Sequence, residues 1–206
     1  MKLRLQFASA MGAKNFAICW LKEIENVRIH EILEGTTVNG PGFRLCVWVQ
    51  GCERRCEGCF NKETWEKSGG KEISVEEIIA IFKKQKYDGI SISGGEPFLQ
   101  DNELEKLLKS VKSLGKNTFV FTGFKYEELI EQKAKSLDFC DYIVDGAYEK
   151  NNPRSCKYAG SGNQRYLHLE NGKIKEDLTN KTENTTDLEI LINENGQVVV
   201  TGFGEI

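Results

Sequence analysis

The sequence predicts an α/β protein built around a mainly parallel sheet. Strand-like and helix-like segments alternate between residues 43 and 145, at a spacing that is typical of βα units. The 206 residues are 39% hydrophobic and 29% charged, which is the composition of a globular domain. A chain of this length fits one domain with a short appendage.

The first βα unit begins with a clear strand. Residues 43–50 are rich in β-forming and apolar types, which predicts a buried strand. Ser74 and Glu77 form a capping box, which predicts that a helix begins there and continues to about residue 84. Residues 88–93 are predicted to form the next strand.

The second half of the alternating region follows the same order. Apolar side chains at helical spacing over residues 104–114 predict a helix, and Gly115 is its stop signal. A strand is predicted over residues 118–122, a helix over residues 126–137 and a strand over residues 142–145.

The two ends of the chain are patterned differently from this core. Residues 1–26 carry only a weak helical stripe, so we divide the chain into an N-terminal appendage and a core over residues 27–170. Residues 171–206 are expected to form a polar loop, over residues 173–187, and a C-terminal β-hairpin. The hairpin is predicted because Asn195-Gly196, which suits a type I′ turn, separates two apolar runs.

Charge and cysteine usage exclude several classes of protein. The net charge of −3 gives no basic excess for nucleic acid, and no apolar run reaches the length of a membrane span. The N-terminus does not resemble a secretory signal, so we expect a cytoplasmic protein. Seven cysteines do not suggest a secreted disulfide framework, and two histidines argue against a histidine-centred triad or zinc site.

Three closely spaced cysteines are the main chemical signal. Cys52, Cys56 and Cys59 have the spacing C-x3-C-x2-C and come directly after the first strong strand. Soft thiolates select zinc, copper(I) or an iron–sulfur cluster. Three cysteine ligands leave one of the four ligand positions of such a site open. Cys46 is the nearby candidate for a fourth ligand, but its place inside the strand favours a buried hydrophobic role. The same role is expected for Cys19, Cys140 and Cys156.

A second motif follows one βα unit later. Gly94, Gly95 and Glu96 stand at the carboxyl end of a predicted strand, which is where ligand sites gather in parallel α/β sheets. The glycines would let the backbone approach a ligand closely, and the carboxylate could accept hydrogen bonds from an ammonium group. A Gly-Gly turn is common by itself, so the motif gains its meaning from the cysteines that precede it.

Together these motifs resemble the radical S-adenosylmethionine (SAM) superfamily. Residues 37–44 (TVNGPGFR), 51–61 and 63–65 (ETW), with Gly69-Gly70, are similar to the anaerobic ribonucleoside-triphosphate reductase activating proteins, a family of glycyl-radical activating enzymes. The resemblance continues through residues 121–124 (FTGF) and residues 126–129 (YEEL). It extends to the closing segments, residues 144–146 (VDG) and residues 160–165 (GSGNQR).

The resemblance assigns roles to residues of both motifs. It implies that Cys52, Cys56 and Cys59 are the catalytic cysteines and the three ligands of a [4Fe–4S] cluster. It also implies a SAM-binding set, which consists of Gly58, Phe60, Gly94, Gly95, Glu96 and Thr122. In that set Glu96 and its glycines hold the SAM amino group, and Thr122 reaches the ribose or the carboxylate.

Three features depart from the family pattern. Asn39 stands where an Asp is usual, and Gly58 replaces the aromatic residue that many radical SAM enzymes carry before the third cysteine. The activating proteins often share this glycine, so it supports the narrower assignment. Residues 171–206 continue past the segment at which the activating proteins often end.

The resemblance implies both a fold and a reaction. The fold is a partial, open (βα) barrel, and 206 residues are indeed short for a full eight-unit barrel. The reaction is reductive cleavage of SAM by the cluster, which gives a 5′-deoxyadenosyl radical. That radical removes a hydrogen atom from a glycine of a partner, an anaerobic ribonucleotide reductase. A low-potential donor, flavodoxin or ferredoxin, supplies the electron.

Two alternatives stay open at this stage. One is a radical SAM enzyme that acts on another enzyme or on a peptide. The other is a zinc-binding interaction module with Cys46, Cys52, Cys56 and Cys59 as a closed site, although closed sites usually use paired knuckles. The charged residues around the cysteines, Arg54 and Arg55 among them, form either a solvated loop or a docking face. A simple surface role is likewise one interpretation of Arg165.

Overall fold

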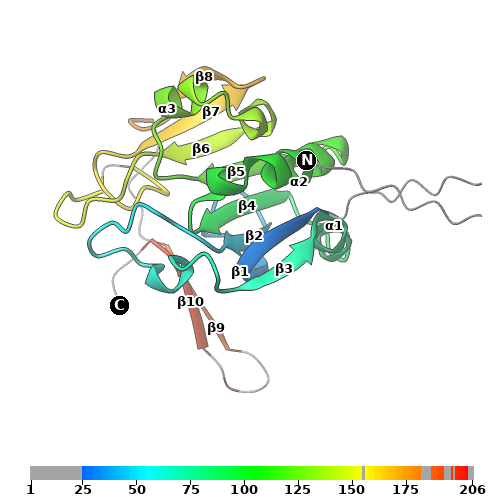
Figure 1. Ribbon diagram of the computed structural model, residues 1–206. Helices are drawn as coiled ribbons and strands as arrows, with labels where there is room; N and C mark the ends of the chain where they lie inside the picture. Colours follow the sequence, from blue (N-terminus) through cyan, green and yellow to red (C-terminus); the bar gives the residue numbers. More distant parts are fainter. Residues whose placement is uncertain (1–24, 155, 182–186, 193–195, 197, 204–206) are drawn as a thin grey trace, which may run out of the picture.

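Eight strands form one open, mixed sheet in the computed structural model, which describes residues 25–154, 156–181, 187–192, 196 and 198–203 (Figure 1). The order across the sheet is β3-β1-β2-β4-β5-β6-β7-β8, and β2, β4, β5 and β6 run parallel at its centre. The bounds are β1 (Asn26–Thr36), β2 (Arg44–Val49), β3 (Lys71–Ser74), β4 (Gly89–Gly94), β5 (Asn117–Phe121), β6 (Tyr142–Asp145), β7 (Arg165–Glu170) and β8 (Lys173–Asp177). Among the described residues β3 and β8 do not pair with each other, so the predicted α/β fold with an open sheet is confirmed.

Three α-helices and three short 3₁₀ helices connect the strands in the part of the chain that the structure describes. The α-helices are α1 (Val75–Phe82), α2 (Asp101–Ser113) and α3 (Tyr126–Glu131), and the 3₁₀ helices are Lys62–Thr64, Pro97–Gln100 and Lys135–Phe139. The predicted capping box is confirmed, because the Glu77 backbone N–H donates to the Ser74 hydroxyl and the Glu77 carboxylate accepts from the Ser74 N–H. No helix in the described part of the chain is both long enough and apolar enough to cross a membrane.

The two faces of the sheet have different cores. Leu45 and Val47 of β2 belong to the larger core, which also contains the buried side chains of α1, α2 and α3. Phe119 of β5 and Val144 of β6 belong to a second, largely aromatic core on the other face. Cys46 lies between Leu45 and Val47 and is fully buried, as its place inside a strand that was predicted to be buried indicated.

A buried arginine closes the amino-terminal end of the parallel strands. The Arg44 guanidinium donates to the Ser91 hydroxyl at 2.7 Å, the Pro41 carbonyl at 2.8 Å, the Asn117 side chain at 2.5 Å and the Ile90 carbonyl at 2.6 Å. Burial lowers the pKa of Arg44 to about 10. Four hydrogen bonds therefore offset the cost of burying this charge, far from the ends of the strands where ligands bind.

Arg44→Ala is expected to reduce the free energy of unfolding by about 3 kcal/mol, because several buried acceptors lose their only charged donor. Urea unfolding monitored by circular dichroism measures this change. Arg55→Ala is the matched control, since the ion pair of Arg55 with Glu66 is exposed and is expected to contribute about 0.5 kcal/mol or less. Equal midpoints for the two variants would contradict the stabilising role of Arg44.

The structure differs from the sequence-based prediction at several elements. Strands β1, β3, β7 and β8 were not expected, and β8 occupies the first part of the segment that was predicted to be a polar loop. The helix predicted over residues 126–137 is wrong in its length. It ends at Glu131 because Lys133 adopts a left-handed conformation, with φ of 57°, and a 3₁₀ helix follows.

The C-terminal hairpin is confirmed as a separate two-stranded sheet. Its strands are β9 (Leu188–Ile192) and β10 (Val198–Gly202), which pair antiparallel. Most of the predicted turn, including Asn195, lies outside the described residues, as does the weak helical stripe in the first 24 residues. The division into an appendage, a core over residues 27–170 and a C-terminal part stays a prediction.

Candidate active site

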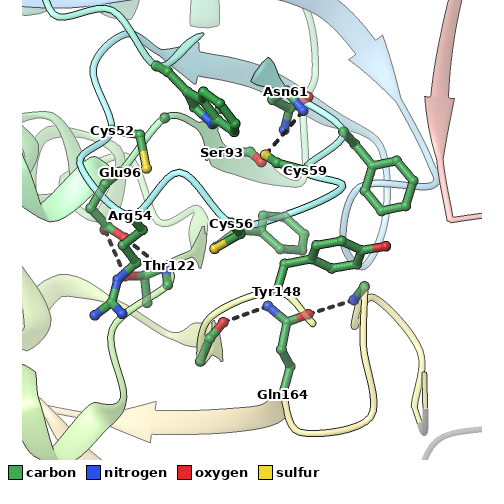
Figure 2. Close-up of a pocket in the computed structure, with 18 of the residues that line it drawn as sticks. Cys52, Arg54, Cys56, Cys59, Asn61, Ser93, Glu96, Thr122, Tyr148 and Gln164 are labelled. Atoms are coloured by element: carbon green, nitrogen blue, oxygen red, sulfur yellow. Dashed lines mark hydrogen bonds between the residues drawn. The ribbon is translucent and has the colours of Figure 1, made fainter. Parts of the chain in front are cut away.

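A pocket lies at the carboxyl ends of the four parallel strands (Figure 2). Segments that follow β2, β4, β5 and β6 each supply part of its lining, as is usual for ligand sites in parallel α/β sheets. The lining residues are Cys52, Arg54, Cys56, Cys59, Phe60, Asn61, Trp65, Ser93, Gly94, Gly95, Glu96, Phe121, Thr122, Gly123, Gly146, Tyr148, Tyr158, Gly160, Gln164 and Phe203. Both sequence motifs therefore meet at one place.

The loop that carries the three cysteines is fixed at its base by hydrogen bonds. The Gln50 side chain donates to the carbonyls of Glu63 and Glu66, at 3.0 and 2.8 Å. The backbone N–H groups of Gly51 and Cys52 donate to the carbonyls of Thr64 and Trp65. The loop therefore leaves the sheet after β2 and returns to it, with its cysteines over the pocket.

Cys52, Cys56 and Cys59 are all partly buried, unlike the other described cysteines, and all three line the pocket. Burial raises the pKa of the Cys52 thiol, and hydrogen bonds from the backbone N–H groups of Arg54 and Arg55 oppose this shift. The N–H of Asn61 lies 3.4 Å from the Cys59 sulfur. Among the described residues no three His, Cys, Asp or Glu side chains converge on one metal position, so the thiols share a pocket without closing a site.

The two glycines of the second motif allow the cysteine loop and strand β4 to approach closely. A Cβ atom on Gly95 would lie 2.3 Å from the Gly51 carbonyl oxygen, and one on Gly94, whose φ is 96°, would lie 2.6 Å from that of Val49. The N–H groups of Gly95 and Glu96 donate to these same carbonyls of Val49 and Gly51, both at 2.8 Å. The glycines thus hold the two motifs together, a role that the sequence did not predict.

Glu96 is buried beneath the pocket, with 2% of its surface exposed. Its carboxylate accepts from the Thr122 hydroxyl at 2.7 Å, from the Gly123 N–H at 2.8 Å and from the Phe98 N–H at 3.2 Å. Burial raises the pKa of Glu96, and these donors, with the charge of Arg54, partly offset the shift. The carboxylate therefore ties the end of β4 to the end of β5, and its second oxygen, Oε2, accepts one of these three hydrogen bonds, from the Gly123 N–H.

Thr122 holds the Glu96 carboxylate by a hydrogen bond in the structure. Its hydroxyl donates to Glu96 and accepts from the Phe124 N–H at 3.1 Å, so both functions of the hydroxyl are engaged. Its place in the pocket agrees with a site residue, while contact with the ribose or carboxylate of SAM stays a prediction.

Arg54 differs from the other charged residues of the cysteine loop. Its guanidinium stacks on the Phe124 ring, 4.3 Å from the centroid, and lies 3.3 Å from a Glu128 oxygen. By contrast, Arg55 and Glu57 form exposed ion pairs, with Glu66 and Lys150 respectively. Arg54 thus belongs to the pocket wall, where it connects the loop to α3.

Gly58 and Phe60 lie against the segment that follows β6. Gly58 has φ of 74°, and a Cβ atom there would meet the Lys150 side chain at 2.8 Å. Phe60 is 74% exposed, and its ring centroid lies 5.1 Å from that of Tyr148. The space beside the third cysteine is therefore occupied by Lys150 and by an aromatic pair rather than by a side chain at position 58.

Several pocket residues were not predicted as site residues. Gln164 donates to the Gly146 carbonyl at 2.7 Å and accepts from the Gly160 N–H at 2.7 Å, which fixes the segments around it. Its motif GSGNQR was the signal that could have identified it. Tyr148, Tyr158 and Phe203 carried no such signal, because each reaches the pocket from a loop or from the chain's far end.

Four other residues have structural roles. Cys46, Cys140 and Cys156 are buried and do not line the pocket, and burial raises the pKa of Cys46 to about 12. Arg165 is not a simple surface residue, because it binds the buried Asp145 and both carboxylate oxygens of Glu127.

The residues of the pocket fit an iron–sulfur cluster and a zwitterionic cofactor. Three thiols stand on one loop, and backbone N–H groups face two of the sulfurs, as suits thiolate ligands. A buried carboxylate with a spare acceptor position lies across the same pocket. The soft thiols suit the iron of a cluster, and the anionic carboxylate suits the ammonium group of a zwitterionic cofactor.

Comparisons with known proteins agree with this chemistry. A family model described as a 4Fe-4S single cluster domain matches residues 38–167. The anaerobic ribonucleoside-triphosphate reductase-activating protein of Enterobacteria phage T4 is 35% identical over 147 residues, which cover 68% of this chain and 93% of the relative. The protein of the same name from Escherichia coli K12 is 33% identical over 150 residues, or 68% of this chain and 97% of the relative. The pyruvate formate-lyase-activating enzyme of Clostridium pasteurianum is 36% identical over 132 residues, or 59% and 56% of the two chains.

Proposed function

We propose, from the premise that this chain belongs to the family of anaerobic ribonucleoside-triphosphate reductase-activating proteins, that it generates the glycyl radical of an anaerobic ribonucleotide reductase. It is an activating enzyme of the radical SAM type, with a 4Fe-4S domain. The observation that carries the proposal is the shared pocket, in which the three thiols and the Gly-Gly-Glu motif stand at the ends of neighbouring parallel strands.

Within this proposal Cys52, Cys56 and Cys59 hold the cluster, and Cys46 does not. Three thiolates leave one iron without a protein ligand, which is the position a cofactor can take. When bound, the cluster and SAM together supply the electron transfer and the carbon–sulfur bond cleavage that give a 5′-deoxyadenosyl radical. A low-potential protein such as flavodoxin or ferredoxin provides the electron.

The protein's own residues orient the cofactor and shield the reaction. Glu96 accepts hydrogen bonds from the SAM amino group, while Thr122 and Gly123 keep its carboxylate in place. Gly58, Phe60, Gly94 and Gly95 complete the proposed SAM-binding set. Aromatic side chains on the opposite wall, Tyr148 and Tyr158, limit the access of water.

The partner is proposed to be the reductase rather than pyruvate formate-lyase. The chain covers 93% and 97% of the two reductase-activating relatives but 56% of the formate-lyase-activating one. All three names describe proteins that activate an enzyme. A protein partner is therefore expected whether that partner is the reductase or pyruvate formate-lyase.

The test is to reconstitute the protein with iron and sulfide without oxygen, then to add SAM and a reductant. We expect 5′-deoxyadenosine to form, and a glycyl radical signal to appear by electron paramagnetic resonance (EPR) on an anaerobic ribonucleotide reductase that is supplied as the substrate. Pyruvate formate-lyase from the same source is the matched alternative substrate. A radical that forms on formate-lyase and not on the reductase would contradict the proposed partner.

A further inference from the structure

The C-terminal hairpin carries an exposed apolar surface. Ile190, Ile192, Val198 and Val200 are 61%, 70%, 58% and 41% exposed, and we call them the hairpin patch. In the register of β9 and β10, Ile192 pairs with Val198 and Ile190 with Val200. Directly paired residues, and residues two apart along a strand, share one face, so the four side chains form one continuous surface.

The opposite face of the hairpin is fastened to the body of the protein. The Thr37 N–H and hydroxyl both donate to Glu189, and the Asn39 side-chain amide donates to the Thr201 hydroxyl at 2.6 Å. Glu189 and Thr201 are paired across the hairpin and lie on the face away from the patch. The amide of Asn39 is thus a donor to the hairpin.

The hairpin also leads directly into the pocket. Phe203 follows the last residue of β10, lines the pocket, and has its ring centroid 5.7 Å from that of Phe121 and 6.3 Å from that of Tyr158. Its N–H donates to the Asp187 carbonyl at 2.9 Å, which closes the base of the hairpin. Val200 of the patch is three positions before Phe203, or about 10 Å along an extended chain. The hairpin that carries the patch therefore ends at the wall of the pocket.

We propose that the hairpin patch is the docking surface for the glycyl-radical reductase. An apolar groove on the reductase would pack against Ile190, Ile192, Val198 and Val200. This inference rests on the proposed function, because it concerns the partner of that same pocket. A protein that inserts a glycine-bearing segment into the pocket must place its own surface beside the pocket mouth, and the hairpin that carries the patch ends there.

Two physical points favour a partner at this surface. A two-stranded hairpin is marginal in water by itself, and exposed clusters of large apolar side chains typically mark sites of protein interaction. The hairpin also lies beyond residues 38–167, which the family model matches. The three cysteines and the Gly-Gly-Glu motif all lie within the matched residues, so the hairpin is an addition to the part of the chain that carries them.

The test compares single charge substitutions on and off the patch. Ile192→Glu and Val198→Glu each place a carboxylate on the patch, and Ile192→Ser is a neutral variant in case the charge disturbs the hairpin. Ile130→Glu is the matched control, because Ile130 on α3 is 49% exposed but outside the patch. The measurements are the anaerobic binding affinity for the reductase and the rate of SAM cleavage by dithionite-reduced enzyme without the reductase.

We expect the two glutamate variants to bind the reductase at least tenfold more weakly and Ile192→Ser to bind it several-fold more weakly. SAM cleavage should stay within twofold of wild type in every variant, and Ile130→Glu should behave as wild type. Reductase affinity within twofold of wild type in the patch variants would overturn the inference. So would a wild-type dimer that the patch variants convert to monomers without loss of affinity, because the patch would then join two copies of this chain. Failure of the wild-type protein to cleave SAM would instead overturn the proposed function.

Discussion

Replacing any one of Cys52, Cys56 and Cys59 by alanine is expected to abolish SAM cleavage. The three thiols line one pocket and are the partly buried cysteines among those described, so each removal takes away one proposed ligand that no neighbour can replace. The measurement is 5′-deoxyadenosine formation by the anaerobically reconstituted variants, together with their iron and sulfide content.

Cys46→Ala is the matched control for these three variants. Cys46 is fully buried in β2, and its thiol pKa is raised to about 12, so it is a poor source of thiolate. We expect Cys46→Ala to assemble the cluster and cleave SAM at the wild-type rate. Cleavage by Cys56→Ala, or loss of the cluster in Cys46→Ala, would refute the proposed set of ligands.

Glu96→Gln is expected to weaken SAM binding by about tenfold to a hundredfold while iron content stays unchanged. The substitution removes the charge that is proposed to face the SAM ammonium group, and a hydrogen bond to a charged group contributes about 1.5–3 kcal/mol. Glutamine has the same size, so most of the contacts to Thr122 and Gly123 can persist and the cavity stays filled. Equilibrium binding of SAM to the reconstituted protein, with iron content measured in parallel, tests whether the substitution affects SAM affinity but not cluster assembly.

Glu57→Gln is the control for Glu96→Gln. Glu57 belongs to the same cysteine loop, but its side chain is 85% exposed and lies outside the pocket. Its loss is expected to leave both SAM affinity and iron content at wild-type values. If Glu96→Gln bound SAM with wild-type affinity, the carboxylate would hold only β4 and β5 together, and its proposed contact with SAM would be wrong.

Local patterns in the sequence identified the parallel core and the two motifs of the site. The strand containing Cys46 and the capping box at Ser74 depend on neighbours within a few positions, so their pattern is readable from the chain. Strand β1 was missed because its alternation is weak: Val27 and Ile29 are buried, but the residues after them are mostly half-exposed. Strand β8 was missed because it is polar and pairs only with β7 at the edge of the sheet.

Contacts between distant segments could not be predicted from the sequence alone. The motif Gly94-Gly95 suggested a close approach to a ligand, whereas in the structure a side chain at either position would collide with the backbone of residues 48–51. The partner of each glycine lies more than 40 positions away. Phe203 and the Arg44 hydrogen bonds are similar cases, since only the folded chain brings them to the pocket wall and to the strand ends.

The central claim is that three cysteines hold a cluster that leaves one iron open to SAM. EPR of the anaerobically reconstituted and reduced protein, recorded with and without SAM, tests it most directly. We predict a [4Fe–4S]⁺ signal whose shape changes when SAM is added, because the cofactor binds the open iron. A cluster signal that is indifferent to SAM, or tightly held zinc with no iron signal, would contradict the claim.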